Sequence, residues 1–234
     1  MSKTLYLLPN LLDENQPVEG FLPSSLKPVV NSLTGLFAES EKGARKYLLK
    51  FMDREKMQKV QIKLLNEHTE DKDLQEYIHS IREKEIWGVV SDAGLPIIAD
   101  PGAKLTMLAH RSKMHVKMVS GPSSIMMALV MSGFNGQKFQ FHGYLPRKEE
   151  QLVQALKDIE KKAKQEQSTQ IWIEAPYRTQ KMIDLSLQHL QKNTLFCVAI
   201  NLTSSHEKVL SMSIAEWKKL NFKTDKSPAV FLLA

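Results

Sequence analysis

The stretch that decides the fold of this chain reads Ile86-Trp-Gly-Val-Val-Ser-Asp-Ala-Gly-Leu-Pro-Ile-Ile-Ala-Asp-Pro-Gly-Ala-Lys104. Its first five residues form a short apolar run, which is typical of a strand buried on both faces of a sheet. Two prolines, Pro96 and Pro101, then exclude a regular helix, and helical spacing of apolar residues returns only after Ala103. The stretch predicts a strand, a long shaped loop at the carboxyl end of that strand, and a helix.

In open α/β sheets, ligands bind at the carboxyl ends of the strands, so this loop is a candidate ligand site. Between Ser91 and Gly102 it contains no lysine or arginine, and neither phosphate-binding pattern, G-x-x-x-x-G-K or G-x-G-x-x-G. This composition argues against a nucleoside triphosphate or an ordinary dinucleotide and favours a ligand held by backbone groups and apolar walls. The alternative is an ordinary connection between a strand and a helix, because glycine and proline are common in such loops.

The bulk composition, 42% hydrophobic and 25% charged residues in 234, is that of a soluble globular protein. No segment has the apolar length needed to cross a bilayer, and the apolar start ends at Pro9, too early for a signal peptide. The single cysteine, Cys197, excludes an internal disulfide, and no His, Asp or Glu grouping has metal-ligand spacing. We therefore expect a cytoplasmic protein with no metal and no membrane partner.

The net charge is +6, from 32 basic and 26 acidic side chains, which is compatible with a polyanionic partner. Basic residues crowd the segment from Lys42 to Lys63, the better candidate for contact with phosphate groups. A second group, from Arg147 to Lys164, is interleaved with acidic residues and indicates a solvated helix face.

The chain alternates between strand and helix patterns, regularly in the first half and with more consecutive strands in the second. The predicted strands span residues 4–8, 36–39, 60–64, 86–90, 116–119, 139–143, 169–174, 195–202, 208–212 and 229–233. The main predicted helices span residues 41–56, 74–81, 125–131, 147–165 and 180–191, and a capping box, Ser213-Ile-Ala-Glu216, begins a short one. The proline-containing segment 10–28 is predicted to be extended, and the helix over 125–131, apolar all round, to be buried. The fold class is thus α/β, with an amino-terminal domain over residues 1–120 carrying the Pro96 loop, a carboxyl-terminal domain over 121–234, and a cleft between them.

Five segments, in this order, resemble the motifs of one family. They are Ser91-Asp-Ala-Gly-Leu-Pro-Ile-Ile-Ala-Asp-Pro-Gly102, Ser120-Gly-Pro-Ser-Ser124, Phe141-His-Gly-Tyr-Leu-Pro-Arg-Lys148, Ile173-Glu-Ala-Pro-Tyr-Arg178 and Asn201-Leu-Thr-Ser-Ser-His-Glu207. The family is the tetrapyrrole methylase superfamily of S-adenosylmethionine-dependent methyltransferases. Within it, the chain is most similar to the branch that methylates a cytidine ribose 2′-oxygen in small-subunit ribosomal RNA.

The resemblance implies two α/β domains, S-adenosylmethionine in the cleft between them, and a homodimer. The residues that it places on the cofactor are Leu8, Pro9, Leu95, Pro96, Ile98, Ser124 and Ile125, with Ala175 and Ala229 closing the far side. Asp100 is a candidate to attract the sulfonium or amino group of the cofactor. Its alternative role is that of a helix N-cap before Pro101.

The amino-terminal part departs from the pattern of this branch. Where the branch has T-P-I-G-N-L-x-D-I-T, this chain has Leu8-Pro-Asn-Leu-Leu-Asp-Glu-Asn-Gln-Pro17. Its A-E-D-T-R is represented by Ala38-Glu-Ser-Glu41, with Arg45 a few residues later. These segments border the acceptor side of the cleft, so the departure bears on the methyl acceptor rather than on the donor.

A ribose hydroxyl needs a base to remove its proton, and Glu39 and Glu174 are the candidate carboxylates. The candidate residues for binding substrate phosphates or carboxylates are Arg45, Arg147, Lys148 and Arg178. The alternatives are a structural hydrogen bond for Glu174 and surface ion pairs for the arginines. The sequence leads to a methyltransferase acting on RNA of the small ribosomal subunit. A tetrapyrrole-type methylase of small molecules and a cofactor-binding protein without turnover remain as alternatives.

Overall fold

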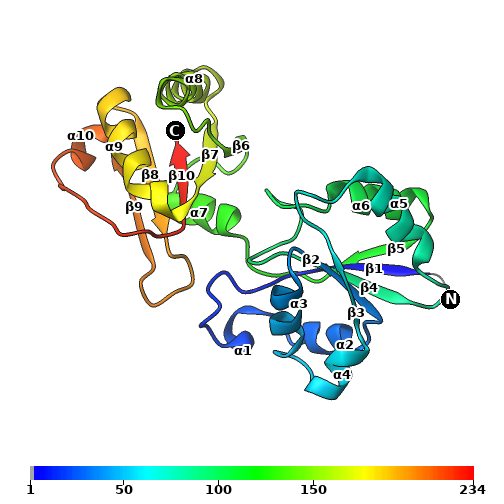
Figure 1. The fold of residues 1–234 in the computed structure, drawn as a ribbon. Coiled ribbons are helices and arrows are strands. Elements are labelled where there is room, and N and C mark those ends of the chain that lie inside the picture. The colour runs from blue at the N-terminus through cyan, green and yellow to red at the C-terminus, as the bar shows by residue number, and fades with distance from the viewer. Residues whose placement is uncertain (1–2) are drawn as a thin grey trace. The chain divides into compact units, whose positions relative to one another are not determined.

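The computed structural model describes residues 3–234, which form two compact units that meet at Ser123 and Ser124 in the sequence (Figure 1). Unit 1 extends to Ser123, and unit 2 comprises Ser124–Ala234. The predicted division at residue 120 lies close to this point in the chain. Each unit contains one five-stranded sheet with helices packed on it.

Unit 1 is built on a parallel sheet with the strand order β3-β2-β4-β1-β5. Its strands are β1 (Thr4–Leu8), β2 (Gly35–Ala38), β3 (Gln61–Leu64), β4 (Ile86–Val90) and β5 (His115–Met118). Its helices are α1 (Val18–Phe21), α2 (Leu26–Asn31), α3 (Glu41–Leu48), α4 (Arg54–Lys59), α5 (Asp71–Ser80) and α6 (Ala103–Arg111). Parallel neighbours need long crossover connections, usually helices, and the regular alternation of strand and helix in the first half of the sequence provides them.

Both faces of the unit 1 sheet are covered, as the continuous apolar runs predict. Alternate residues of one strand point to opposite faces, so Val89 joins the core under α5 and α6 while Val90 joins the core under α2 and α3. Figure 1 shows these two helix layers on either side of the sheet. Trp87, 1% exposed, packs its ring 4.8 Å from that of Phe37 in the first of these cores.

Unit 2 has a mixed sheet with the strand order β6-β7-β10-β8-β9. Its strands are β6 (Phe139–Tyr144), β7 (Thr169–Glu174), β8 (Leu195–Ile200), β9 (Lys208–Ser213) and β10 (Ala229–Leu233). Its helices are α7 (Ser124–Ser132), α8 (Glu149–Glu166), the 3₁₀ turn η1 (Pro176–Arg178), α9 (Thr179–His189) and α10 (Ile214–Trp217). Only β6 and β7 pair in parallel, and the other three pairings are antiparallel. The consecutive strands β8 and β9 pair antiparallel because the turn between them, from Asn201 to Glu207, is too short for a crossover.

The core of unit 2 lies under α8, α9 and α10 and is rich in aromatic residues. The rings of Trp172 and Phe231 stack at a centroid distance of 5.6 Å, and Phe196 stacks on the same pair. Helix α7 packs against β8, β9 and β10. The prediction that this helix is buried all round is wrong, because Val130 is 78% exposed. A helix lying on a sheet needs one buried stripe, which here includes Ile125 and Leu129.

Two predicted segments differ from the structure. The segment predicted to be extended contains α1 and α2, and Pro28 lies in the first turn of α2, where a proline costs no helical hydrogen bond. The predicted helix over residues 41–56 is two helices, because α3 ends at Leu48 and Asp53 caps α4 by accepting from the Lys56 backbone N–H at 2.9 Å.

Candidate functional site

The connections that follow the parallel strands of unit 1 lie at one edge of its sheet, the edge formed by the carboxyl ends of the strands. The connection after β2 runs to β3, and the connection after β4 runs across the sheet to β5, in opposite directions. Such a reversal between neighbouring strands opens a crevice where ligands bind in α/β sheets. Here the Asp92 backbone N–H donates to Glu39 Oε1 at 3.2 Å and links the two diverging connections. The Pro96 loop thus lies at the edge of the sheet that the sequence predicts.

The backbone of the Pro96 loop is irregular throughout, as predicted, and takes left-handed geometry at four positions. Two are glycines, Gly94 (φ +68°) and Gly102 (φ +131°), and two are Ile97 (φ +79°) and Ala99 (φ +65°). Residues with a Cβ atom store of the order of 1–3 kcal/mol of strain there, and such strain clusters at functional sites. Surrounding contacts must hold this loop in shape.

Asn10, 8% exposed, supplies those contacts from the end of β1. Its Nδ2 donates to the Ser91 carbonyl at 3.1 Å and to the Asp92 carbonyl at 2.9 Å, and its backbone N–H donates to the Gly94 carbonyl at 2.8 Å. Its Oδ1 accepts from the Leu11 backbone N–H at 2.9 Å. Asn10 therefore fixes the first half of the Pro96 loop, through its side chain at Ser91 and Asp92 and through its backbone at Gly94.

Two residues from the end of α3 support this arrangement. Lys50 Nζ donates to Asn10 Oδ1 at 3.0 Å, and burial, followed by the charge of Lys46, lowers the pKa of Lys50. The buried hydroxyl of Tyr47 donates to the Pro9 carbonyl at 3.2 Å, and burial raises its pKa. Pro9 also lies against Gly121, since a Cβ built at Gly121 would be 2.1 Å from Pro9 Cβ. The connections after β1, β4 and β5 are in this way packed together.

Three carboxylates, Glu39, Asp92 and Asp100, come together at this edge. The pKa of Glu39 is raised by burial and by the charges of Asp100 and Asp92, although the hydrogen bond from the Asp92 backbone opposes the shift. The pKa of Asp100 is raised by burial and by Asp92, against a hydrogen bond from Ser91. Asp100 is not the N-cap of α6, because Gly102 holds that position. The site has an excess of negative charge, which favours a cationic ligand.

The other residues predicted to face the cofactor from unit 1 lie around the same connections. Leu8 is fully buried in the core, so its backbone alone can reach a ligand, whereas Ile98 is 41% exposed. Pro9 and Pro96 are buried, and Leu95 is half-buried. Ser124 and Ile125 begin α7 of unit 2, and Ile125 is 8% exposed.

The predicted residues of unit 2 also gather at one edge of its sheet. Ala229 at the start of β10 pairs with Glu174 at the end of β7, and Ala175 follows directly. The Glu174 carboxylate is nearly inaccessible and lies 3.2 Å from Arg178 Nη2, which also donates to the Pro146 carbonyl at 3.3 Å. This buried ion pair gives both charged side chains a structural role and leaves Glu174 poorly placed to take a proton from a substrate.

The remaining basic candidates are on the surface. Arg45 lies in α3, 2.5 Å from Glu41 Oε1, in an ion pair one helical turn long. Arg147 and Lys148 are exposed just before α8. Exposed side chains of this kind are free to contact a polyanion, since the i,i+4 pair of Arg45 contributes only a few tenths of a kcal/mol.

Comparison with known proteins shows which family this chain belongs to. Models of protein families give no match. Ribosomal RNA small subunit methyltransferase I of Hydrogenobaculum sp. is 30% identical over 180 residues, which cover 72% of this chain and 76% of that protein. The chain belongs to the ribosomal RNA small subunit methyltransferase I family. The member from Thermotoga maritima is 30% identical over 151 residues, covering 64% of this chain and 65% of that protein. This chain spans less than two thirds of the length of several members, down to 44%.

Solved structures show the same fold. Diphthine synthase aligns with a TM-score of 0.58 and 14% identity over 99% of this chain and 89% of its own. Uroporphyrin-III-C-methyltransferase from Thermus thermophilus aligns with a TM-score of 0.55 and 13% identity over 100% of this chain and 92% of its own. The predictions of the tetrapyrrole methylase superfamily and of an α/β fold with two domains are confirmed. Methyltransferases of this family use S-adenosylmethionine, in agreement with the predicted enzyme class and cofactor.

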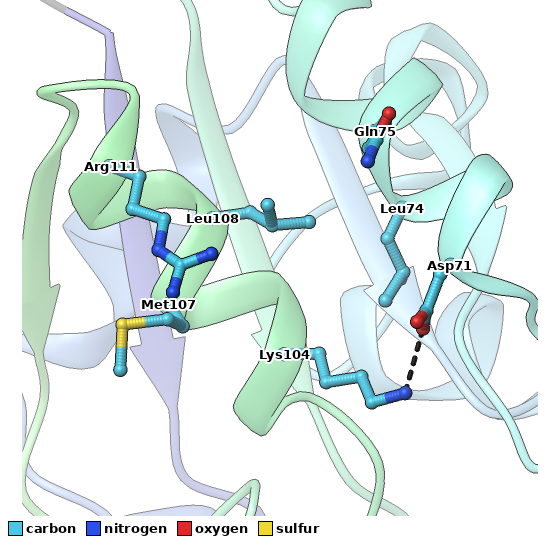
Figure 2. A pocket seen from close by; sticks show the side chains of 7 residues that line it. All are labelled: Asp71, Leu74, Gln75, Lys104, Met107, Leu108 and Arg111. Atoms are coloured by element: carbon cyan, nitrogen blue, oxygen red, sulfur yellow. Dashed lines mark hydrogen bonds and ion pairs between the residues drawn. The ribbon is translucent and has the colours of Figure 1, made fainter.

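A pocket of about 290 Å³ elsewhere in unit 1 contains none of the predicted family residues. It lies between α5 and α6 and is lined by Asp71, Leu74, Gln75, Lys104, Met107, Leu108 and Arg111 (Figure 2). Lys104 Nζ contacts Asp71 Oδ1 at 2.7 Å, and both side chains are 73% exposed. An ion pair as exposed as this one contributes little to the stability of the fold. The pocket is a surface groove between two helices.

Over residues 3–234, no group of His, Cys, Asp or Glu is arranged to hold a metal ion, and no helix is long and apolar enough to cross a membrane. Cys197 is fully buried in β8, and burial raises the pKa of its thiol to about 12. This buried thiol has a structural role.

Sequence reasoning missed Asn10 and Lys50 as site residues. Asn10 is separated by about eighty positions from the loop that it holds, so no local spacing connects them. The available signal was its place, directly after a strand and a proline, at the edge where ligands bind in this family's fold.

Proposed function

We propose that this chain is an S-adenosylmethionine-dependent methyltransferase that acts on RNA of the small ribosomal subunit, at the ribose 2′-oxygen of a cytidine. Membership in a family of ribosomal RNA methyltransferases is the observation that carries the proposal. The names of these relatives favour RNA over a porphyrinoid acceptor. We further propose that the protein acts in the cytoplasm, that it forms a homodimer, and that its two domains divide at residue 120.

The residues at the edge of unit 1 fit the proposed cofactor. S-adenosylmethionine has a sulfonium and an amino group, no phosphate, and a largely apolar body. The Pro96 loop offers backbone groups and apolar side chains, and Glu39, Asp92 and Asp100 offer negative charge. We assign cofactor contacts to Pro9, the Leu8 backbone, Leu95, Pro96, Ile98 and Asp100, with Ser124, Ile125, Ala175 and Ala229 completing the site from unit 2.

The cofactor, when bound, supplies an activated methyl carbon. The work left to the protein is alignment of the acceptor oxygen and removal of its proton. Alignment can contribute up to about 7–11 kcal/mol in ideal cases. Glu39 is the better base, because burial raises its pKa toward neutrality, whereas Glu174 is held by Arg178. Arg45, Arg147 and Lys148 are assigned to phosphates of the RNA, and Arg178 to the support of Glu174.

The test is transfer of labelled methyl from S-adenosylmethionine to small subunits, or their RNA, isolated from cells that lack this protein. We expect labelling by the wild type, a loss of at least 100-fold in Glu39→Gln, and no loss in Glu67→Gln, an exposed glutamate of the same unit. Sequencing of the product would place the modified nucleotide. Labelling of a porphyrinoid but not RNA, or cofactor binding without transfer to any acceptor, would refute the proposal.

A further inference from the structure

A hollow of about 530 Å³ in unit 2 belongs to none of the groups assigned above. It lies between the turn that joins β8 to β9 and the segment that leads into β10. Because β8 is antiparallel to both neighbours, these two segments meet at one edge of the sheet. The volume suits a ligand of the size of a nucleotide. The β8–β9 turn is also the last of the five family-like segments, Asn201–Glu207, and has no role in the function proposed so far.

The walls of this hollow are tied together by Asn201. Its backbone N–H donates to the Pro228 carbonyl at 3.0 Å, and its Nδ2 donates to Ser227 Oγ at 3.2 Å. Asn201 and Thr203 both have left-handed backbones, with φ of +51° and +71°. Strain of this kind persists only where surrounding contacts impose it. The hollow is therefore a preformed feature rather than a gap between loose loops.

One lysine that lines the hollow, Lys208, is held by an aromatic ring. Lys208 Nζ lies 4.9 Å from the centroid of the Phe222 ring, which in turn packs edge-on against the fully buried Trp217 at 5.6 Å. A cation over a ring at an exposed site gains about 0.5–1 kcal/mol, enough to bias the ammonium group toward one position. The position of the Lys208 ammonium group is thus set by Phe222, which is itself packed against the core residue Trp217.

A second lysine lines the same hollow, with weak competition for its charge. Lys223 Nζ is 3.7 Å from Asp184 Oδ1, and the two side chains are 69% and 54% exposed, so solvent screens the pair. Asp225 is the carboxylate among the lining residues. Nearby, Glu207 accepts from the Thr203 backbone N–H at 2.7 Å and is engaged in the turn itself. Two lysines, of which Lys208 is held over an aromatic ring, against one lining carboxylate favour an anionic ligand.

We propose that this hollow binds a phosphate group of the RNA backbone, with Lys208 and Lys223 as its cations. The inference rests on the proposed RNA methyltransferase function and adds to it a contact on unit 2. Neutral donors beside the two ammonium groups, such as the Thr224 hydroxyl, complete the surroundings of a phosphate. A strand bound there would be positioned without being read by sequence, because a phosphate carries no base information.

The test compares two double variants that remove the same charge. Lys208→Gln with Lys223→Gln empties the hollow of its cations. Lys218→Gln with Lys219→Gln removes two exposed lysines of the same unit that do not line it. The affinity for small-subunit RNA is measured between 50 and 300 mM salt for each, together with calorimetric binding of S-adenosylmethionine and circular dichroism.

We expect the first pair to weaken RNA binding about tenfold and to lower the slope of log affinity against log salt by about 0.7 for one lost phosphate contact. The second pair should change affinity less than threefold, and both should bind S-adenosylmethionine as the wild type does. Equal effects of the two pairs would overturn the assignment while leaving the proposed function intact. If the wild type neither binds nor methylates RNA, both proposals fail together.

Discussion

Replacement of Asn10 by Ala tests whether one buried amide holds the Pro96 loop. The change removes four side-chain hydrogen bonds: two donated to the Ser91 and Asp92 carbonyls, and two accepted from the Leu11 backbone and Lys50. A typical intramolecular hydrogen bond contributes about 0.5–1.5 kcal/mol, and a buried group left without a partner costs about 1–3 kcal/mol. Water can reach the Asp92 side of the site, so we expect a loss of about 3–5 kcal/mol in the free energy of unfolding of unit 1.

The assay is hydrogen exchange measured by mass spectrometry, which reports on unit 1 separately, with thermal unfolding as a second measurement. Peptides covering 86–102 should lose protection in Asn10→Ala, and S-adenosylmethionine should bind at least tenfold more weakly. The matched control is Asn15→Ala, which removes an exposed asparagine side chain whose Nδ2 donates to Asp13 Oδ1 at 3.0 Å. A result within 0.5 kcal/mol of this control would refute the reasoning, because the loop would then keep its shape without Asn10.

Three further outcomes are expected. Because burial raises the pKa of Glu39, the folded state favours its protonated form and the charged form is a cost at neutral pH. Glu39→Gln should therefore stabilise unit 1 slightly at pH 8, with the gain vanishing below about pH 4, while methyl transfer is lost; urea unfolding at both pH values checks this. Gly121→Ala would bring a Cβ to 2.1 Å from Pro9 Cβ and should cost about 1–3 kcal/mol in thermal unfolding, whereas Gly136→Ala, with nothing within 4 Å, should cost less than 1 kcal/mol. Cys197 should resist alkylation at pH 8 until the protein is unfolded, since burial raises its pKa to about 12.

The sequence predicted the elements whose signal is local. The apolar runs and their alternation with helical patterns led to two α/β domains and to the Pro96 loop at the carboxyl end of β4. Local signals also misled where prolines were interpreted only as helix breakers, since Pro28 is compatible with the first turn of α2. The break between α3 and α4 had a local signal of its own, the capping residue Asp53.

The chemistry of the site could not be predicted as well, because it depends on contacts between distant segments. The raised pKa of Glu39 comes first from its burial by the fold, and then from the charges of Asp100 and Asp92, about sixty and fifty residues away. The pairing of Glu174 with Arg178, by contrast, follows from their i,i+4 spacing and could have been expected from the sequence. A candidate base on a segment with a basic residue one turn away should be weighed against such pairing.

The carboxylates of Glu39 and Asp100 should release protons when S-adenosylmethionine binds. Burial raises the pKa of both Glu39 and Asp100 in the free protein; the charges of Asp100 and Asp92 add to the shift of Glu39, and the charge of Asp92 adds to that of Asp100. A cation bound beside them favours their charged forms, so binding must lower both pKa values and release protons. By linkage, affinity for S-adenosylmethionine should rise as the pH increases through the raised pKa values of Glu39 and Asp100, and it should level off above them.

Calorimetric titration at pH 5 in buffers of different ionisation enthalpy measures the protons released directly. S-adenosylhomocysteine is the matched ligand, because it lacks the sulfonium charge and keeps the rest of the molecule. We expect a fraction of a proton released per molecule of S-adenosylmethionine, less for S-adenosylhomocysteine, and a reduced release in Asp100→Asn. Equal release with the two ligands would mean that the sulfonium does not sense these carboxylates, and that their negative charge at this edge serves the amino group or the acceptor instead.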